Sequence, residues 1–531
     1  ALLLYCRAVT RAPHSGSSLC LAYANRSAAL CQLAEYRWCL RDIRLALLHG
    51  YPSNLHYKVL ERAGHCYDKL SHTHHAVSCF RKALTTLPNS GLDPGAQQTW
   101  NKNITKKLDA CVKKQEEKKK KDLDDKGSKE DEKHEGHGSK NFDDDDVLIN
   151  DSENISVSDG KGVGEAAPHQ ELFRGPSPVL PSASAAITLE SSPEAGRSVV
   201  AKEDVPAGEL LVSEEPFAAV LARDKTGSYC SHCFRRLMAP VPCPDCCGVA
   251  YCCQRCHDDA AVYHRWECVY LELLHGSGMS LNCYLSLRII TKHPLQYFTK
   301  LRPQLKKSKL LEGTGSECSG PGNVTKSVPL MVPTASHPHD SSSYLSVYHT
   351  VALHEQRDPY DFLQRSLMAI LLLKVLQRTG YFGSWDEEIP ADADAGDVEV
   401  FIGALLLRNL QVLQFNAHEV SGMTFLSEPP TFQQSKSFYL GLAIYTTVAF
   451  FNHSCYPAVA RHFHGSRMLV SSIRTLKKGE VVCENYGPIF THHSLEQRRR
   501  KLLSRYWFKC VCIACEEDWK TFGRAVVTGA L

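Results

Sequence analysis

A run of closely spaced cysteines in the middle of the chain constrains its fold more than any other feature. The spacing is Cys230-x2-Cys233-x9-Cys243-x2-Cys246-x5-Cys252-x3-Cys256-x7-His264-x3-Cys268. Eight soft ligands within 39 residues are enough to hold two tetrahedral zinc ions. A segment this short cannot build a core of its own, so we expect metal to supply its folding energy. The alternative, eight side chains packed as core or as reactive thiols, fits the spacing poorly.

Composition indicates the environment in which these cysteines work. The chain has 23 cysteines among 531 residues, and its apolar start, Ala1–Leu4, lacks the charged region and cleavage site of a signal peptide. Clustered Cys-x-x-Cys pairs in such a chain favour zinc ligation over disulfides. We therefore expect a reducing compartment, the cytosol, the nucleus or both.

Three further properties exclude broad classes of protein. A hydrophobic share of 43% excludes wholesale disorder, and a net charge of +3 excludes a global polycation aimed at nucleic acid. The longest apolar runs, such as Leu367–Leu373, fall short of the roughly 18 residues that indicate a membrane span, so we expect no membrane partner. The length predicts three or four domains.

Residues 1–112 have the apolar spacing of helices and contain an internal repeat. The repeat has a constant offset of 37 residues, at which Leu33, Cys39, Ile43, Ala46 and Leu47 match Leu70, Ala76, Phe80, Ala83 and Leu84. Helix pairs with small residues at such positions resemble tetratricopeptide (TPR) repeats, which present a concave surface to a protein partner. An unrelated helical bundle is the alternative.

Two segments have the composition of linkers or loops. Residues 113–185 are densely charged and poor in apolar side chains, which predicts a flexible linker. Its lysine run is either a nuclear address or solvated charge, and the interleaved acids favour the second interpretation. Residues 303–346 are rich in Ser, Gly, Pro and Thr, which predicts a flexible surface loop.

The remaining sequence alternates short β-like runs with helices. From about residue 186 the runs ITLE, RSVVA and ELLVSEEPFAAVLA are separated by Gly and Pro turns. Residues 360–378 and 398–415 have the pattern of largely buried helices. A last cluster, Cys510-x-Cys512-x2-Cys515, supplies three zinc ligands and requires a fourth.

Four separated sequence pieces flank the central cysteine segment, one before it and three after it. They are EAGRSVVAKEDVPAGELLVSEEP (194–216), QFNAHEV (414–420), FFNHSCYPAVARHF (450–463) and KKGEVVCENYGP (477–488), the last followed by RRRKLLSRYWFKCVCIAC (498–515). Together with the YCCQRC and HRWEC segments of a MYND zinc finger, they resemble the SET and MYND domain-containing (SMYD) lysine methyltransferases, and the N-terminal repeats resemble the TPR-bearing branch of that family.

The resemblance implies a multidomain α+β fold. It comprises a helical TPR-like array, a β-rich SET domain split by a MYND finger and a helical insertion, and a zinc-bound post-SET segment. After the array and linker, the implied divisions are 186–229 (SET, N-terminal part), 230–268 (finger), 269–430 (insertion), 431–490 (SET, C-terminal part) and 491–531 (post-SET). The family's C-terminal helical domain is expected to be missing from these 531 residues.

The resemblance also implies three structural zinc ions. In the family the finger ligands interleave, which assigns one ion to Cys230, Cys233, Cys252 and Cys256, and a second to Cys243, Cys246, His264 and Cys268. The neighbouring thiols of Cys247 and Cys253 leave the register open. The third ion is assigned to Cys510, Cys512 and Cys515, with Cys455 as the implied fourth ligand and water as the alternative.

By the same resemblance, the chain is an S-adenosylmethionine-dependent protein-lysine N-methyltransferase. The implied cofactor contacts are Ala195, Gly196, Arg197, Asn416, Asn452, His453, Tyr486 and Phe508. Tyr486 is the implied catalytic residue, and Tyr506 and Phe508 resemble the aromatic residues that line the lysine channel. The free amine of lysine has a pKa of about 10.4, and a narrow apolar channel beside a sulfonium would favour its reactive neutral form. We expect no histidine or carboxylate to serve as an obligatory base.

Two departures from the family pattern keep a second interpretation open. Ser198 stands where a second glycine is common, and Ala458 stands where the family has an asparagine. With the missing C-terminal domain, they favour a weakly active scaffold in transcriptional regulation. In both interpretations the MYND and TPR modules bind peptide or protein partners in the nucleus and cytoplasm. We expect no direct nucleic-acid binding, because the finger carries Asp245, Asp258 and Asp259 beside few basic residues.

Overall fold

The computed structural model describes residues 1–12, 17–126, 171–192, 196–246, 248–307, 333–383, 395–425 and 435–522. The chain divides into two compact units, one formed by residues 1–165 with 236–253 and the other by residues 166–235 with 254–531. Each unit is described by itself below.

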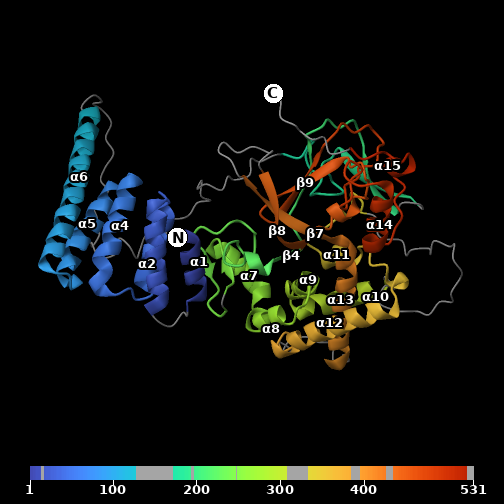
Figure 1. Ribbon diagram of the computed structural model, residues 1–531, viewed down its shortest axis with the longest axis horizontal. Helices are drawn as coiled ribbons and strands as arrows, with labels where there is room; N and C mark the ends of the chain where they lie inside the picture. The colour runs from blue at the N-terminus through green and yellow to red at the C-terminus, as the bar shows by residue number, and fades with distance from the viewer. Residues whose placement is uncertain are drawn as a thin grey trace. The chain divides into compact units, whose positions relative to one another are not determined.

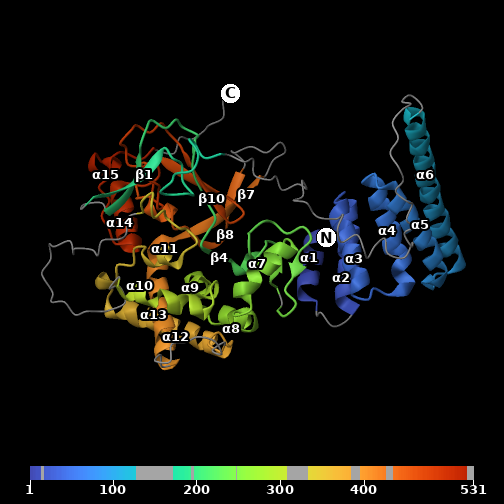
Figure 2. The same cartoon turned by 180° about the vertical axis from the view of Figure 1, so that it is seen from behind.

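The first unit is built mainly from helices, as the repeat predicts. Consecutive helices lie side by side in both views (Figures 1 and 2). They are α1 (Leu2–Arg11), α2 (Ser17–Gln32), α3 (Tyr36–Leu48), α4 (His56–Lys69), α5 (Thr73–Thr86) and α6 (Pro94–Lys126), with short 3-10 turns at Ser53–Leu55 and Leu87–Ser90. The helical character of the array is confirmed, and its assignment to the TPR class stays a prediction.

Small residues set the close packing of this array. Gly64 of α4 faces Phe80 of α5, and a Cβ atom at Gly64 would lie 2.7 Å from the Phe80 ring. Cys39 and Ala76, which are equivalent in the repeat, are both completely buried. Three of the five matched pairs, Cys39/Ala76, Ile43/Phe80 and Ala46/Ala83, are therefore buried positions, whereas Leu33 is exposed.

A buried ion pair lies between α2 and α3 of this unit. Arg26 Nε lies 2.6 Å from Asp42 Oδ2, and both side chains are fully buried. Arg26 Nη2 also donates to the carbonyl of Pro240 (3.3 Å), and Arg41 Nη2 donates to that of Ala239 (2.9 Å). The buried Arg26 and the partly buried Arg41 thus anchor the loop of the cysteine segment that belongs to this unit, where β5 (Val241–Pro242) pairs with β6 (Ala250–Tyr251).

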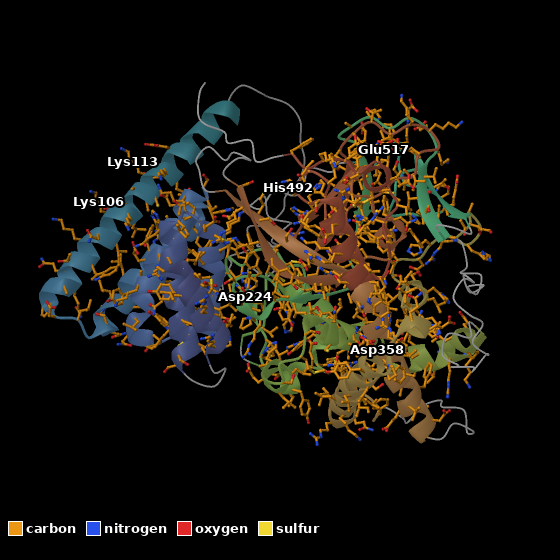
Figure 3. All side chains as sticks on the ribbon, turned by 45° about the vertical axis from the view of Figure 1, so that its right-hand side comes forward. Lys106, Lys113, Asp224, Asp358, His492 and Glu517 are labelled. Atoms are coloured by element: carbon orange, nitrogen blue, oxygen red, sulfur yellow. The ribbon has the colours of Figure 1, made fainter. Side chains whose placement is uncertain are left out.

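The predicted linker is shorter than residues 113–185. Helix α6 continues to Lys126, and Figure 3 shows Lys106 and Lys113 along it. The sequence between 113 and 126 contains neither Gly nor Pro and is rich in Lys and Glu, which favour helix. At the other end, Ser177 N donates to Ala183 O (2.7 Å), so this part is folded as well. Residues 127–170 lie outside the described part.

The second unit contains three small antiparallel sheets that form a common β core. Their strand orders are β1-β2, β3-β10-β9 and β4-β8-β7. The strands are β1 (Ile187–Ser192), β2 (Gly196–Ala201), β3 (Leu210–Glu214), β4 (Ala218–Leu221), β7 (Ala417–Phe425), β8 (Ser435–Ile444), β9 (Val459–His464) and β10 (Arg467–Ser472). The β-like runs predicted from residue 186 onward are confirmed.

Helices accompany the sheets in the same unit. They are α7 (Gln254–His264), α8 (Leu271–Gly276), α9 (Leu281–Thr291), α10 (Leu295–Lys307), α11 (Tyr344–Tyr348), α12 (Pro359–Arg378), α13 (Ala395–Asn416), α14 (Leu495–Tyr506) and α15 (Ile513–Glu516). The helices predicted at 360–378 and 398–415 are therefore confirmed as α12 and α13. Asp358, labelled in Figure 3, caps α12 by accepting from Asp361 N.

Helix α13 is long and largely apolar. Within the described residues, Asp397–Asn416 is one helix whose length and composition would suffice to cross a membrane. Most of it is buried against α9 and α12, where Leu405, Leu372 and Leu287 have no exposed surface. A core helix meets the same criteria, so we interpret α13 as the centre of the helical insertion.

The predicted loop 303–346 is ordered at both ends. Residues 303–307 continue α10, with Pro303 inside the helix, and α11 begins at Tyr344. His339 is buried, where its backbone N–H donates to Val179 O (2.9 Å) and its Nε2 lies 3.0 Å from Thr446 Oγ1. Contacts made by residues distant in sequence order this polar stretch, and residues 308–332 lie outside the described part.

Candidate functional site

The cysteine segment places its eight predicted ligands in two groups. One group is Cys230, Cys233, Cys252 and Cys256, and the other is Cys243, Cys246, His264 and Cys268, with ligand atoms within 4.8 Å of one another in each. The two groups are those of the predicted interleaved pairing, with Cys252 rather than Cys253 in the first. Cys247 lies outside the described residues. Each group has the number and type of donors that a closed tetrahedral zinc site requires.

His264 is oriented by a buried carboxylate. Its Nδ1 lies 3.4 Å from Glu267 Oε1, which leaves Nε2 to face a metal ion. Glu267 also pairs with Arg288, and both side chains are largely buried. Burial would raise the pKa of Glu267, but the charge of Arg288 and the contact with His264 lower it, so the carboxylate is ionised. No local sequence pattern predicts this support, because Arg288 belongs to another helix.

A third group of thiols joins two distant pieces of the chain. Cys455 Sγ lies 3.6 Å from Cys515 Sγ and 4.0 Å from Cys510 Sγ, and Cys512 completes the group. The backbone N–H of Cys455 also donates to Cys512 Sγ (3.4 Å). Cys455 therefore lies where the predicted fourth ligand of this group would be. Four thiols with no open position fit a structural zinc ion.

Arg498 holds the helix that leads into this thiol group. Its side chain has no exposed surface; Nη1 donates to His493 O and Nη2 to Ala514 O, both at 2.7 Å. Helix α14 begins with a capping box in which Ser494 and Gln497 bond each other's backbone N–H groups. Arg498 therefore ties α14 to α15, a role that the sequence analysis missed.

Asn452 connects the first piece of the motif to the third. Its Nδ2 donates to Arg197 O (3.1 Å) and to Ser198 Oγ (3.0 Å). Its own carbonyl accepts from the N–H of Glu484 (2.9 Å), which belongs to the fourth piece. Three pieces of the motif therefore meet at Asn452, and the first of them lies more than 250 residues before it in the chain. Ser198, a departure from the family pattern, is here a hydrogen-bond acceptor for Asn452.

His453 connects the fourth piece to the thiol group. The N–H of Tyr486 donates to His453 Nδ1 (3.0 Å), so this nitrogen carries no proton. The other ring nitrogen, Nε2, lies 3.3 Å from Cys455 Sγ, to which it can donate. Burial lowers the pKa of His453 to about 4, in keeping with the neutral ring that both contacts require. One imidazole thus couples the position of Tyr486 to that of Cys455.

Tyr486 lies in an aromatic cluster and is anchored at both ends. Its hydroxyl donates to Phe451 O (2.7 Å), and burial raises its pKa well above the usual range. Its ring centroid lies 5.0 Å from that of Tyr506 and 6.5 Å from that of Phe508. The Tyr506 hydroxyl donates to the carbonyl of Tyr486 (3.2 Å). The predicted catalytic and channel residues are therefore brought together.

A cavity of about 150 Å³ lies beside this cluster. It is lined by Phe415, Asn416, Ala417, His418, Glu419, Ala449, Arg461, Glu484, Tyr486, Gly487, Arg505 and Tyr506. The lining combines aromatic rings with charged groups of both signs. Such a cavity can hold a cationic or amine-bearing chain between the rings.

Charged residues line this cavity, where we expected no histidine or carboxylate to serve as an obligatory base. Glu484 Oε2 lies 2.9 Å from Arg461 Nη1, and Glu484 Oε1 lies 3.4 Å from His418 Nε2. Burial opposes ionisation of Glu484, yet its contacts with His418 and Arg461 lower its pKa. A carboxylate and a histidine therefore do line the site. Because Glu484 is paired twice, it is a fixed negative charge rather than a free base.

The remaining predicted cofactor residues lie around the same loops. Gly196 has a left-handed φ of +64°, and a Cβ atom there would meet nothing within 4 Å. Arg197 Nη2 donates to His349 O (3.1 Å), and Asn416 Nδ2 donates to Val351 O (2.7 Å). Phe508 has its ring centroid 6.0 Å from that of His453. Ala195 lies outside the described residues.

Comparison with known proteins identifies one matching domain family and several relatives. The profile of the SET domain family matches residues 196–487. The protein “Protein-lysine N-methyltransferase SMYD4” of Pongo abelii is 26% identical over 570 residues, which cover 98% of this chain and 65% of that protein. Its namesake in Homo sapiens is 25% identical over 98% of this chain and 65% of its own length. “N-lysine methyltransferase SMYD2” of Homo sapiens is 24% identical over 61% of this chain and 59% of that protein. The chain thus spans 65% of the length of the first two relatives.

Proposed function

The chain belongs to the SET domain family, and on this basis we propose that it is an S-adenosylmethionine-dependent protein-lysine N-methyltransferase. Relatives that match 98% of the chain carry the name protein-lysine N-methyltransferase. The observation that best supports the proposal is the position of Tyr486 on the wall of the 150 Å³ cavity, held by His453 on its backbone and by Phe451 on its hydroxyl.

The residues near the cavity fit the cofactor. Gly196 leaves open space where a ligand can approach the backbone closely, and Asn452 fixes the carbonyl of Arg197 beside it. Asn416 lies on the cavity wall with its amide held by Val351 O and Val412 O. When bound, S-adenosylmethionine supplies a methyl group on a sulfonium. We assign Gly196, Arg197, Asn416, Asn452, His453 and Phe508 to its binding.

The chain's own residues would prepare the substrate amine. The rings of Tyr486, Tyr506 and Phe415 exclude water from the cavity wall, which disfavours the ammonium form of lysine. The Tyr486 and Tyr506 hydroxyls would orient the amine, and the pre-set geometry lowers the barrier by positioning. Glu484 adds a fixed negative charge but is already paired with Arg461 and His418, so it need not accept a proton.

We further propose that all three groups of ligands hold zinc, and that the metal is structural. The group at Cys455 would fix α14 and α15, and with them Tyr506 and Phe508, against the cavity. We also propose that the helical array and the finger bind peptide or protein partners, including transcriptional co-regulators, in the nucleus and cytoplasm. The alternative is a scaffold with little activity, favoured by Ala458 in place of the family's asparagine.

Two measurements test the proposal. Calorimetry should show binding of S-adenosylmethionine to the zinc-loaded chain, and a peptide array or automethylation should reveal transfer. The substitution Tyr486→Phe removes one hydrogen bond to Phe451 O, so the stability should change by only about 1 kcal/mol. Transfer should fall about a hundredfold if the hydroxyl acts in the transition state.

A matched control is Tyr439→Phe, because Tyr439 is a partly exposed tyrosine on β8 that does not line the cavity. This variant should keep the wild-type rate. Equal rates for wild type and Tyr486→Phe would remove Tyr486 from the catalytic site. Failure of the wild-type chain to bind the cofactor would instead support the scaffold.

A further inference from the structure

Three cysteines that the zinc assignments do not use meet inside the helical array. Cys31 lies in the last turn of α2, Cys39 lies in α3 and Cys66 lies in α4. Their sulfur atoms all lie within 4.8 Å of one another, and the Cys66 and Cys31 sulfurs are 4.0 Å apart. The same 4.0 Å separates Cys455 from Cys510 in the post-SET group. The array thiols are therefore as close as thiols that form a predicted zinc site.

The packing of the array does not require sulfur at these positions. Cys39 is equivalent in the repeat to Ala76, and both side chains are completely buried at a helix contact. The turn after α2 includes Ala34 with a left-handed φ of 59°, and it returns the chain so that Cys31 and Cys39 come together. An alanine fills the corresponding position between α4 and α5, so the helix contact at Cys39 does not by itself require a sulfur atom.

Other thiols of the array behave differently. Cys20 donates to the carbonyl of Ser17 (3.0 Å), and Cys6 donates to that of Met238 (3.4 Å). A backbone carbonyl is the usual acceptor for a buried thiol. By contrast, Cys66 donates to the sulfur of Cys31. The Cys66 thiol therefore faces another thiol rather than the backbone.

Cationic side chains and a route from solvent lie beside Cys31. Arg62 and His65 are close enough to Cys31 to interact with it electrostatically. Arg62 is held in place by Ala24 O (3.0 Å) and Ser27 Oγ (2.7 Å). Cys31 is partly exposed, whereas Cys39 and Cys66 are fully buried, so an ion can enter from the side of Cys31.

We propose that Cys31, Cys39 and Cys66 form a three-thiolate site for a soft monovalent metal ion, Cu(I). Soft thiolates select Cu(I) and zinc, and zinc in structural sites takes four ligands. Among the described residues, no fourth Cys, His, Asp or Glu ligand atom joins this group. Binding would release the thiol protons to solvent, and the guanidinium of Arg62 would offset part of the resulting negative charge. The site is independent of the proposed methyl transfer.

The test is an anaerobic titration of the full, zinc-loaded chain with Cu(I) in the presence of bicinchoninate as a competing chelator. Wild type should take up one equivalent of Cu(I) and keep its zinc. The variants Cys31→Ser and Cys66→Ser should bind that equivalent at least a hundredfold more weakly. The control Cys20→Ser alters a thiol of the same array outside the group and should bind as wild type does.

A second measurement uses only the wild-type chain, so it does not depend on whether a variant folds. In wild type, Cu(I) should slow alkylation of the partly exposed Cys31 at least tenfold, measured by peptide mass spectrometry. Three outcomes would overturn the proposal: Cys31 alkylated equally fast with and without Cu(I), equal Cu(I) uptake by wild type and Cys31→Ser, or uptake matched by release of zinc. A Cys31–Cys66 disulfide that forms in place of Cu(I) binding would also overturn it.

Discussion

The backbone N–H of Tyr486 donates to Nδ1 of His453 at 3.0 Å, and the opposite nitrogen of the same ring lies 3.3 Å from Cys455 Sγ. The proposed catalytic tyrosine is therefore positioned by a residue whose second contact is a predicted zinc ligand. The thiol group of Cys455, Cys510, Cys512 and Cys515 is therefore linked to the cavity through one imidazole.

This coupling predicts the behaviour of His453→Gln. A glutamine side chain can replace one of the two ring contacts but cannot span both, so Tyr486 loses part of its orientation. We expect methyl transfer to fall at least tenfold while the zinc content stays unchanged. His492→Gln is the control, because His492 is an exposed histidine nearby in the sequence, labelled in Figure 3. A rate unchanged by His453→Gln would show that the hydrogen bond to Tyr486 is dispensable.

Removing one thiol tests the closure by Cys455. Metal analysis should find three zinc ions per wild-type chain and two in Cys455→Ser, because three thiolates hold zinc less well than four. Cofactor affinity should fall too, since α14 and α15 lose their anchor. Cys483→Ser is a matched control, because Cys483 is a partly buried cysteine of the fourth motif piece that does not belong to the metal group. A count near two in wild type would mean that the closure is wrong.

Arg498 should contribute strongly to stability. The substitution Arg498→Leu removes two charged hydrogen bonds, takes this donor from the partly buried carbonyl of His493, and leaves the carbonyl of Ala514 with the N–H of Trp519. We expect the free energy of unfolding of the unit formed by residues 166–235 and 254–531 to fall by about 3 kcal/mol, measured by urea denaturation. The exposed neighbour Arg500 offers the control Arg500→Leu, which should change stability by less than about 0.5 kcal/mol. Similar losses for both variants would contradict this role.

Local patterns in the sequence predicted the metal groups better than the supports around them. The spacing of Cys230 and Cys233 alone predicts that they are metal ligands. The resemblance carried by the four motif pieces implied that Cys455 closes the last group. Glu484 pairs with His418 across 66 positions of sequence, and Arg498 reaches Ala514 across 16. Such partners are chosen by tertiary packing, and no local pattern marks them.

The predicted boundaries of the linker (113–185) and of the surface loop (303–346) were wrong for a related reason. The charged run between 113 and 126 is compatible with both helix and linker, because Lys and Glu favour exposed helices and solvated coils alike. The preceding part of α6 packs on α4 and α5 through residues such as Ile104 and Cys111, and the helix continues from there. The order of the loop around His339 likewise depends on Thr446, more than 100 residues away.

Deleting the array should leave cofactor binding intact. Every described residue of the cavity belongs to the unit of residues 166–235 and 254–531. A chain without residues 1–150 should therefore bind S-adenosylmethionine within about twofold of the wild-type affinity by calorimetry. The loop that contains Ala239 and Pro240 loses Arg41 and Arg26 as donors, so zinc content must be measured alongside. A large loss of affinity with full zinc content would contradict the independence of the site.

Glu214 should make stability depend on pH. Its buried carboxylate accepts from the N–H groups of Thr447 (2.9 Å) and Val448 (3.1 Å), at the start of the turn that leads to Asn452. Burial raises its pKa from the ordinary 4.5 to about 7, despite these hydrogen bonds. Between these values the folded chain binds a proton that the unfolded chain does not. Stability from this group is therefore fully present below about pH 4.5 and is lost as the pH rises through about 7.

The variant Glu214→Gln keeps an oxygen acceptor for one of these N–H groups and removes the charge. Its stability relative to wild type should rise by up to about 3 kcal/mol between pH 5 and pH 8, because a shift of one pKa unit corresponds to about 1.4 kcal/mol. Urea denaturation across this range measures the difference. Glu215→Gln is the control, since the exposed Glu215 carboxylate pairs with Arg467 at the surface, and its profile should run parallel to that of wild type. Parallel profiles for wild type and Glu214→Gln would show instead that Glu214 has the same pKa in the folded and unfolded chains.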